Sequence, residues 1–241
     1  MFSNCDKLTE LDLSIFNTVN ITDMSYMFEN CSKIITLNLS NFDTAKVTDM
    51  AFMFSTCTKL VNLDISSFDT SNVVDMDYMF YHNLNLTTLN LSNFNTSKVT
   101  DMSSMFEDCK RLKSLDLSTF NTSSLKFMES MFSGCESLIE LNVSNFDTSK
   151  FSNLYGTFIN CKKLTILDIR GFYTSITVEP YRPTEEERDS NVLYHYFPKI
   201  KEVCVQNMFH GCNSLKLLKV NENFQTSKLM HLHYGIKIEI M

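Results

Sequence analysis

The chain repeats one unit of 26 residues about eight times, and this period restricts it to a repeat architecture. Written out, the unit is M-F-x-x-C-x-x-L-x-x-L-x-[LIV]-S-x-F-[DN]-T-[SA]-x-V-T-D-M-x-x. Six cysteines follow one another at intervals of 26 or 52 residues, namely Cys5, Cys31, Cys57, Cys109, Cys135 and Cys161. A threonine recurs in every unit, at Thr18, Thr44, Thr70, Thr96, Thr122, Thr148, Thr174 and Thr226.

One unit cannot bury its own apolar stripe, whereas stacked units align Leu on Leu and Phe on Phe into one core. We therefore predict a repeat solenoid, leucine-rich-repeat-like, in which Leu-x-x-Leu-x-Leu forms a short parallel β-strand in each coil. The Val-Thr-Asp-Met segment alternates in the same way and is a candidate second strand. Apolar residues three and four apart between Asp-Met and the cysteine predict a short helical turn that closes the coil.

The whole chain, 1–241, is expected to form a single solenoid domain with one interruption. Phe209 follows Phe158 by 51 residues, which is 25 more than one unit. We place the extra residues in an inserted loop at about 178–202. Its aromatic residues are suited to partner binding, and the alternative is that they only cover the edge of a coil; they are Tyr181, Tyr194, Tyr196 and Phe197.

The two ends of the predicted stack differ. Ile236, Ile238 and Ile240 alternate with charged residues, which predicts a capping strand at about 234–241. The chain opens in the middle of a unit at Met1-Phe2, so the apolar edge of the first coil is expected to be exposed. This favours either a longer natural protein or self-association at the N-terminal coil.

Composition excludes several classes of partner. The net charge of −7 argues against non-specific binding of nucleic acid. No stretch of 18 apolar residues occurs, so we expect no membrane insertion, and the first residues lack the pattern of a signal peptide. A chain with these properties is expected to be intracellular or a fragment of a longer protein.

Most residues whose side chains could react or bind a metal have a structural explanation in the repeat. The cysteines are expected to be buried thiols, with Cys204 off the ladder and the most exposed. A ladder of Asp23, Asp49, Asp75 and Asp101 suggests either a divalent cation site or turn capping, and we favour capping.

The remaining metal-like cluster is weaker. A zinc site would need His210, Cys212, His231 and His233 to converge, and Cys212 occupies the core slot. With no phosphate-cradling loop and no nucleophile elbow, we predict no enzyme activity and no cofactor.

A regular array of polar side chains is expected on the outer face of the strands. If the sheet meets a partner, these residues form the contact surface, whereas the alternative is that they are simply solvated. They are Asp12, Asn38, Asp64, Asn90, Asp116, Asn142 and Asp168.

The units Leu-x-x-Leu-x-Leu-Ser-x-Phe-Asp-Thr-Ser-x-Val-Thr-Asp-Met-Ser-x-Met-Phe-x-x-Cys resemble the BspA-type leucine-rich-repeat surface proteins, over about 1–178 and 203–232. The resemblance implies a cell-surface or secreted protein that binds a host-derived protein or glycan, so an adhesin is our leading expectation. The alternative is a structural or scaffold protein inside a cell or virion that assembles through its solenoid ends.

Overall fold

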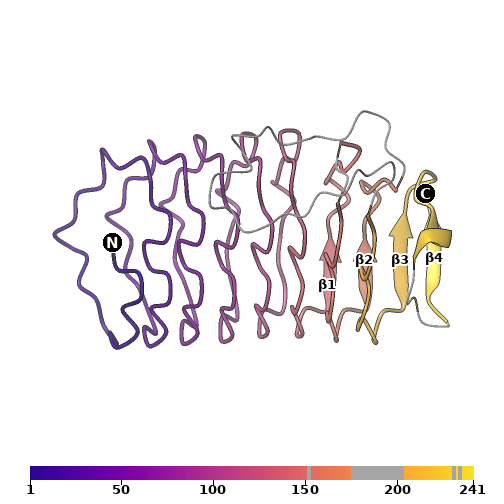
Figure 1. Ribbon diagram of the computed structural model, residues 1–241, viewed down its shortest axis with the longest axis horizontal. Coiled ribbons are helices and arrows are strands. Elements are labelled where there is room, and N and C mark those ends of the chain that lie inside the picture. Colours follow the sequence, from indigo (N-terminus) through magenta and orange to yellow (C-terminus); the bar gives the residue numbers. More distant parts are fainter. Residues whose placement is uncertain (151–152, 175–203, 230–231, 233–234) are drawn as a thin grey trace.

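The computed structural model is a row of coils that stack along one axis (Figure 1). It describes residues 1–150, 153–174, 204–229, 232 and 235–241. The predicted inserted loop at 178–202 lies outside the described residues. Among these residues, no helix has the length and apolar character needed to cross a bilayer.

Four short strands form one parallel sheet in the order β1-β2-β3-β4. They lie side by side towards the C-terminal end of the stack (Figure 1), and their bounds are Glu140–Asn142 (β1), Ile166–Asp168 (β2), Leu217–Val220 (β3) and Lys237–Ile240 (β4). The register pairs Leu141 with Leu167 and Leu167 with Leu218, so the strand leucines align in the core as expected. In the part of the chain that is described, the strands begin only at Glu140, so the expectation of one strand in every coil was too broad.

The Val-Thr-Asp-Met segments pair between coils through single bridges. Asp23 bridges Asp49, and the same parallel pairing continues through Asp75 and Asp101 to Phe127. The backbone N–H of Thr48 donates to the Thr22 carbonyl, at 2.8 Å. The second predicted strand is therefore reduced to one bridge per coil.

The predicted helical turn is wrong, because overlapping tight turns occupy that segment, two of which have a positive φ at the third residue. In the second coil the N–H of Met27 donates to Met24 O, and the N–H of Cys31 donates to Phe28 O. The third residue of each turn has a positive φ, 56° at Tyr26 and 54° at Asn30, which is the geometry of a type II turn. The one helix among the described residues is a single 3-10 turn at Thr226–Lys228 (η1).

Hydrogen bonding to the next coil explains why turns replace a helix. An α-helix satisfies its interior N–H groups within itself. Here alternate N–H groups leave the segment instead: Tyr26 donates to Ala51 O at 2.9 Å and Phe28 donates to Met53 O at 2.9 Å. Stacking thus supplies partners that an isolated turn would lack, and apolar spacing alone could not reveal this.

The core is a column of phenylalanine rings with one ring per coil. Phe28 and Phe54 lie 5.7 Å apart with an interplanar angle of 7°, and both are fully buried. The column is unbroken across the long interval, because Phe209 stacks on Phe158 at 5.8 Å and 2°. Offset stacking of this kind contributes about 0.5–1.5 kcal/mol per pair beyond the burial of apolar area.

Two recurring polar residues join neighbouring coils. Thr18 Oγ1 donates to the Asp43 carbonyl at 2.9 Å and accepts from the Asp43 N–H at 2.7 Å. Cys57 Sγ lies 3.1 Å from Phe28 O in the preceding coil, and Asn83 in the same slot donates to Phe54 O at 2.9 Å. The cysteine slot thus requires a small buried donor, which accounts for its tolerance of asparagine.

The positive-φ turn positions generate a first prediction. Thr56 is β-branched and has a φ of 60°, which is unfavourable, whereas asparagine tolerates this conformation and stands in the same slot at Asn30. Thr56→Asn should therefore raise the free energy of unfolding by about 1 kcal/mol in urea titrations. Thr36→Asn, at an exposed position without positive φ, should change it little; equal effects would contradict the argument.

The buried thiols generate a second prediction. Burial raises the pKa of Cys57 and Cys109 to about 12, so their reactive thiolate forms are scarce near pH 8. In the native protein, iodoacetamide should modify the partly exposed Cys5 and Cys204 first and reach Cys57 and Cys109 only after unfolding in urea. Peptide mass spectrometry checks the order, and labelling of native Cys57 as fast as Cys5 would show that the coils open readily.

Candidate functional site

The polar array on the strand face lies largely where the sequence placed it. Six of its members are exposed, in successive coils; they are Asp12, Asn38, Asp64, Asn90, Asp116 and Asn142. We call these six residues the strand-face ladder. At the parallel-strand spacing of about 4.8 Å per coil, the ladder spans about 24 Å.

Each ladder side chain also has a local structural role. Asp12 Oδ1 accepts from the backbone N–H of Ser14 at 2.9 Å, and Asn38 Oδ1 accepts from Ser40 N–H at 3.1 Å. The same bond to the residue two positions later recurs at Asp64, Asn90, Asp116 and Asn142. These Asx turns end the strand segment and leave the second polar atom of the side chain facing solvent.

The bonds also keep the ladder carboxylates ionised. The N–H of Ser118, helped by its hydroxyl, lowers the pKa of Asp116 below its ordinary value, and Ser14 does the same for Asp12. For Asp64 the hydroxyl of Ser66 is the larger cause. The ladder therefore alternates fixed negative charges with neutral amides from one coil to the next.

Asp168, the seventh predicted member, differs from the others. It is only 6% exposed, because the Arg170 guanidinium covers it. Arg170 Nε lies 2.9 Å from Asp168 Oδ1 and Nη2 lies 2.8 Å from Oδ2, which is a bidentate ion pair. The expectation that Asp168 is an exposed contact residue was wrong, because the sequence does not show that Arg170 turns back onto it.

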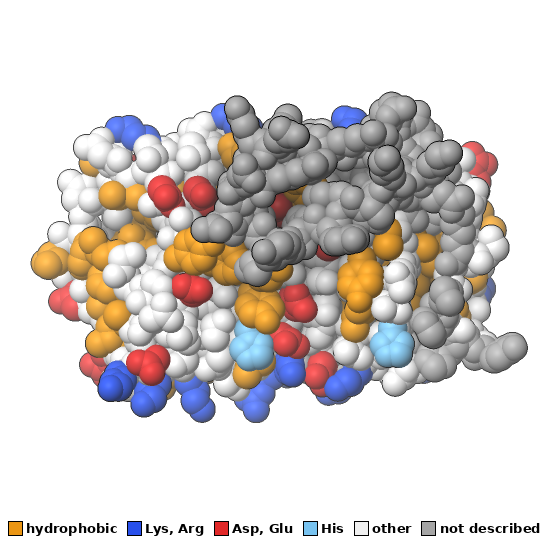
Figure 2. All heavy atoms as spheres, in the orientation of Figure 1, with side chains coloured by type: hydrophobic (Ala, Val, Ile, Leu, Met, Phe, Trp, Pro, Cys, Tyr) orange, Lys and Arg blue, Asp and Glu red, His pale blue; other side chains and the backbone are white. Residues whose placement is uncertain are grey.

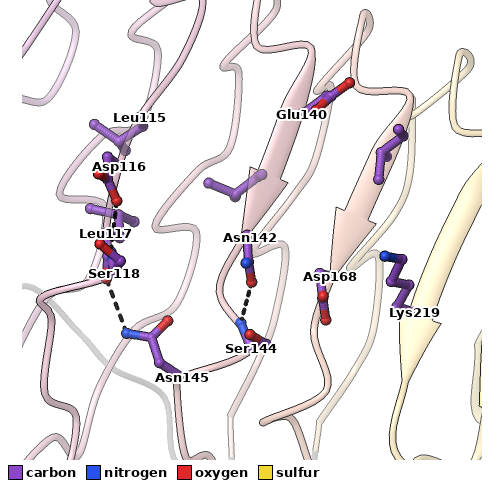
Figure 3. Close-up of a pocket in the computed structure, with 12 residues that line it drawn as sticks. Leu115, Asp116, Leu117, Ser118, Glu140, Asn142, Ser144, Asn145, Asp168 and Lys219 are labelled. Atoms are coloured by element: carbon purple, nitrogen blue, oxygen red, sulfur yellow. Dashed lines mark hydrogen bonds between the residues drawn. The ribbon is translucent and has the colours of Figure 1, made fainter. Parts of the chain in front are cut away.

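A groove of about 490 Å³ lies where the ladder meets the regular sheet (Figure 3). Asp116, Asn142 and Asp168 come together on its floor, from neighbouring coils. Asn142 is paired in register with Asp168, and Asp168 with Lys219, so positive and negative groups lie side by side. Glu140 and Ser144 also line the groove, whose chemistry is that of a polar, hydrogen-bonding surface.

The other predicted contact residues, Tyr181, Tyr194, Tyr196 and Phe197, lie outside the described residues. His231 and His233 do as well. Cys212 is buried and donates to Phe158 O at 2.9 Å, so its sulfur points into the core. In the described part of the chain, no group of three or more His, Cys, Asp or Glu side chains has an arrangement suited to a metal ion.

A second set of aspartates, distinct from the strand-face ladder, caps turns as expected: Asp23, Asp49, Asp75 and Asp101. Asp23 Oδ1 accepts from Ser25 N–H at 2.8 Å, and Asp49 Oδ1 accepts from Ala51 N–H at 2.9 Å. Stacking brings these carboxylates close to one another, and burial together with neighbouring Asp75 and Asp23 raises the pKa of Asp49. The capping role is therefore combined with like-charge repulsion between coils.

Sequence reasoning missed a buried carboxyl group beside this ladder. Asp77 is 4% exposed, and its Oδ1 has no hydrogen-bond partner. Burial, followed by the charges of Asp75, Asp101 and Asp49, raises the pKa of Asp77 to about 9. The signal in the sequence was an acidic residue at a slot that holds Ser or Ala in three other coils, namely Ser25, Ala51 and Ser103; Glu129 is a second acid at this slot.

An outward-facing aromatic column was also missed. Tyr26 and Phe52 stack at 4.7 Å and 8°, and Phe52 and Tyr78 stack at 4.5 Å and 7°. Tyr26 is 42% exposed. The rings cover one another's faces, so the column is mainly a stacking device for the turn segment.

Asp77 generates a third prediction, concerning pH. The folded carboxyl keeps its proton to about pH 9, while the unfolded one ionises near 3.8, so its contribution to stability falls as pH rises between these values. Asp77→Asn should therefore raise the free energy of unfolding at pH 8 by more than about 1 kcal/mol, and the gain should vanish near pH 4.

Asp116→Asn is the matched control, because the pKa of Asp116 is lowered and not raised. It should have no stabilising effect at pH 8. Urea unfolding across the pH range measures both variants, and a gain for Asp77→Asn that does not change with pH would show that its carboxyl is not protonated in the folded state.

Comparison with known proteins places the chain in a family. No curated protein matches it. The model of the family DUF285, described as "Mycoplasma protein of unknown function", matches residues 1–88 and 81–178. These matches cover the coils that carry the strand-face ladder and more than half of the 241 residues. The chain therefore belongs to the DUF285 family.

Proposed function

We propose that the chain is a non-catalytic binding protein, a leucine-rich-repeat-like solenoid whose strand face recognises a protein or glycan ligand. The observation that carries the proposal is the strand-face ladder, six exposed carboxylate or amide groups on consecutive coils, leading into a groove of about 490 Å³. The resemblance to BspA-type surface proteins supports a role in adhesion or host contact at the cell surface.

The geometry of the ladder suits an extended ligand. One polar atom of each side chain is held in an Asx turn, so the direction of the other is fixed before a ligand arrives. A row of such groups can add many weak hydrogen bonds to an extended peptide or sugar chain, as repeat proteins commonly do along a regular surface.

The same chemistry supports a role without catalysis. The ladder carboxylates Asp12, Asp64 and Asp116 have lowered pKa values, so they are poor proton donors near neutral pH. The serines beside them donate their N–H groups to these carboxylates. This face can accept hydrogen bonds from a ligand and present negative charge to it.

One observation favours the scaffold alternative. In the first coil the apolar side chains of Phe2, Leu8, Leu11 and Phe16 are only partly buried, and Ile15 is 87% exposed. Such an apolar coil face can stack against another subunit. Self-association that depends on concentration in size-exclusion chromatography, lost in Ile15→Lys, would favour this alternative.

The fourth prediction tests the strand face. Asp64→Asn combined with Asp116→Asn keeps the Asx turns, because Asn38 and Asn90 make the same bond, but removes two charges. Retention of this variant on fixed host cells, purified extracellular-matrix proteins and a glycan array should fall about tenfold relative to the unmodified chain.

Asp43→Asn combined with Asp69→Asn is the matched control. These residues also form Asx turns, with Ala45 and Ser71, and their slot holds asparagine at Asn95. The control should retain full binding. A chain lacking 178–202 tests the inserted loop in parallel. Equal losses in the two aspartate variants would assign the effect to net charge, and no retention of the unmodified chain on any surface would overturn adhesion.

A further inference from the structure

Positive side chains recur at one corner of the coil, two residues after the cysteine slot. Each is the third residue of a tight turn, in which the N–H of the following leucine or isoleucine donates to the cysteine carbonyl, as Leu60 does to Cys57 at 2.9 Å. All of these side chains are exposed, and we call them the cation row: Lys7, Lys33, Lys59, Arg111 and Lys163.

Hydrogen bonds beside the row show that the slot stacks from coil to coil, so that Lys7, Lys33 and Lys59 are on consecutive coils and Arg111 and Lys163 follow at intervals of two coils. Thr58 Oγ1 donates to Ser32 O at 3.2 Å, and Asn85 Nδ2 donates to Thr58 O at 2.7 Å. Lys33 and Lys59, one position later, are therefore separated by one coil step of about 4.8 Å. Figure 2 shows Lys and Arg side chains along the lower edge of the molecule, with Asp and Glu side chains among them.

The fold itself gains nothing from these charges. Like charges on adjacent strands are unfavourable, and among the described residues no ion pair involves a member of the row. Other recurring side chains, such as Cys57 and Thr18, bond the neighbouring coil. The slot also holds neutral Asn85 and Ser137, so the coil does not require a cation there.

Neighbouring acids do not neutralise the row. Lys162 Nζ lies 2.9 Å from Glu136 Oε2, and Lys110 lies 3.7 Å from both Glu136 and Asp108. These pairs occupy the acidic groups next to Arg111 and Lys163, whereas Asp6, the exposed acid next to Lys7, forms no ion pair in the described part of the chain. In a chain of net charge −7, a single-file line of unpaired cations is left at this edge.

We propose that the cation row binds a linear anionic polysaccharide, one that carries sulfate or carboxylate groups along its chain. A row one side chain wide matches a polymer lying across the coils, with its anions meeting successive cations. A membrane surface would call for a broad cationic patch, and duplex DNA presents the phosphates of two strands on a wider surface than a single row of cations covers. The site is separate from the strand-face ladder and does not depend on the function proposed for that face.

The test measures binding to immobilised heparin, a sulfated polysaccharide, with elution by NaCl. The intact chain should be retained at about 0.15 M salt and released as salt screens the charges. Replacement of Lys33, Lys59 and Arg111 by Asn, the residue that Asn85 already places in this slot, should weaken binding about tenfold. Thermal unfolding confirms that the variant is folded.

The matched control removes three lysines from another edge. Lys46, Lys98 and Lys150 share a slot that holds Asn72, and they bond Asn20, Asn72 and the carbonyl of Ser123. Replacing all three by Asn changes the net charge equally and should leave heparin binding within about twofold. Equal loss in both triple variants, or no retention of the intact chain, would overturn the proposal.

Two further binding experiments distinguish the class of ligand that the cation row binds. Duplex DNA or anionic phospholipid vesicles that bind as tightly as heparin would also overturn it, because the row would then recognise negative charge of any kind. Asp64→Asn with Asp116→Asn should not weaken heparin binding. Failure of adhesion through the strand face can therefore be distinguished from failure of the cation row.

Discussion

The structure depends on hydrogen bonds that join each coil to the same position of the next coil, 25 or 26 residues away. Alternate N–H groups of the turn segment leave it for the neighbouring coil, as Tyr26 does to Ala51 O and Phe28 to Met53 O. Because this register is fixed, every slot of the repeat becomes a column of like side chains. The phenylalanine core, the threonine bonds and the thiol bonds all follow from that alignment.

The stacking of similar side chains in successive coils has unfavourable consequences as well. Two turn positions per coil take positive φ, and residues as large as Tyr26 and Phe52 occupy them, so the backbone is strained where neither glycine nor asparagine is present. Stacked carboxylates around Asp77 raise its pKa to about 9. Stacking therefore both creates the core and concentrates charge. Residues that repeat from coil to coil but form no hydrogen bond or ion pair within the protein become candidates for contact with a partner.

The two candidate surfaces illustrate this distinction. Members of the strand-face ladder, such as Asp64, hold an Asx turn and still present a polar atom to solvent. Lys33 and Lys59 are exposed and form no ion pair among the described residues. The ladder thus has a role within the coil beside its proposed contact role, whereas the described contacts give the cation row no role within the coil.

The sequence by itself determined the 26-residue period, the alignment of apolar side chains and the position of the strand-face ladder. These follow because stacking buries whatever recurs at apolar slots and exposes the alternating residues of a strand. It also indicated that Asp23 and Asp49 cap turns. A slot filled by Asp in four successive coils carries that local information.

Only the tertiary structure decided how the remaining groups behave. Apolar spacing of three and four suits a helix and two tight turns equally, and the choice depended on carbonyl groups supplied by the next coil. The burial of Asp77, the ion pair that covers Asp168, and the stacking of Tyr26 on Phe52 depend on neighbours 2 to 26 residues away whose orientation no local pattern encodes. Contacts between coils bury Asp77 and stack Tyr26 on Phe52, whereas Asp168 is covered within its own coil by Arg170.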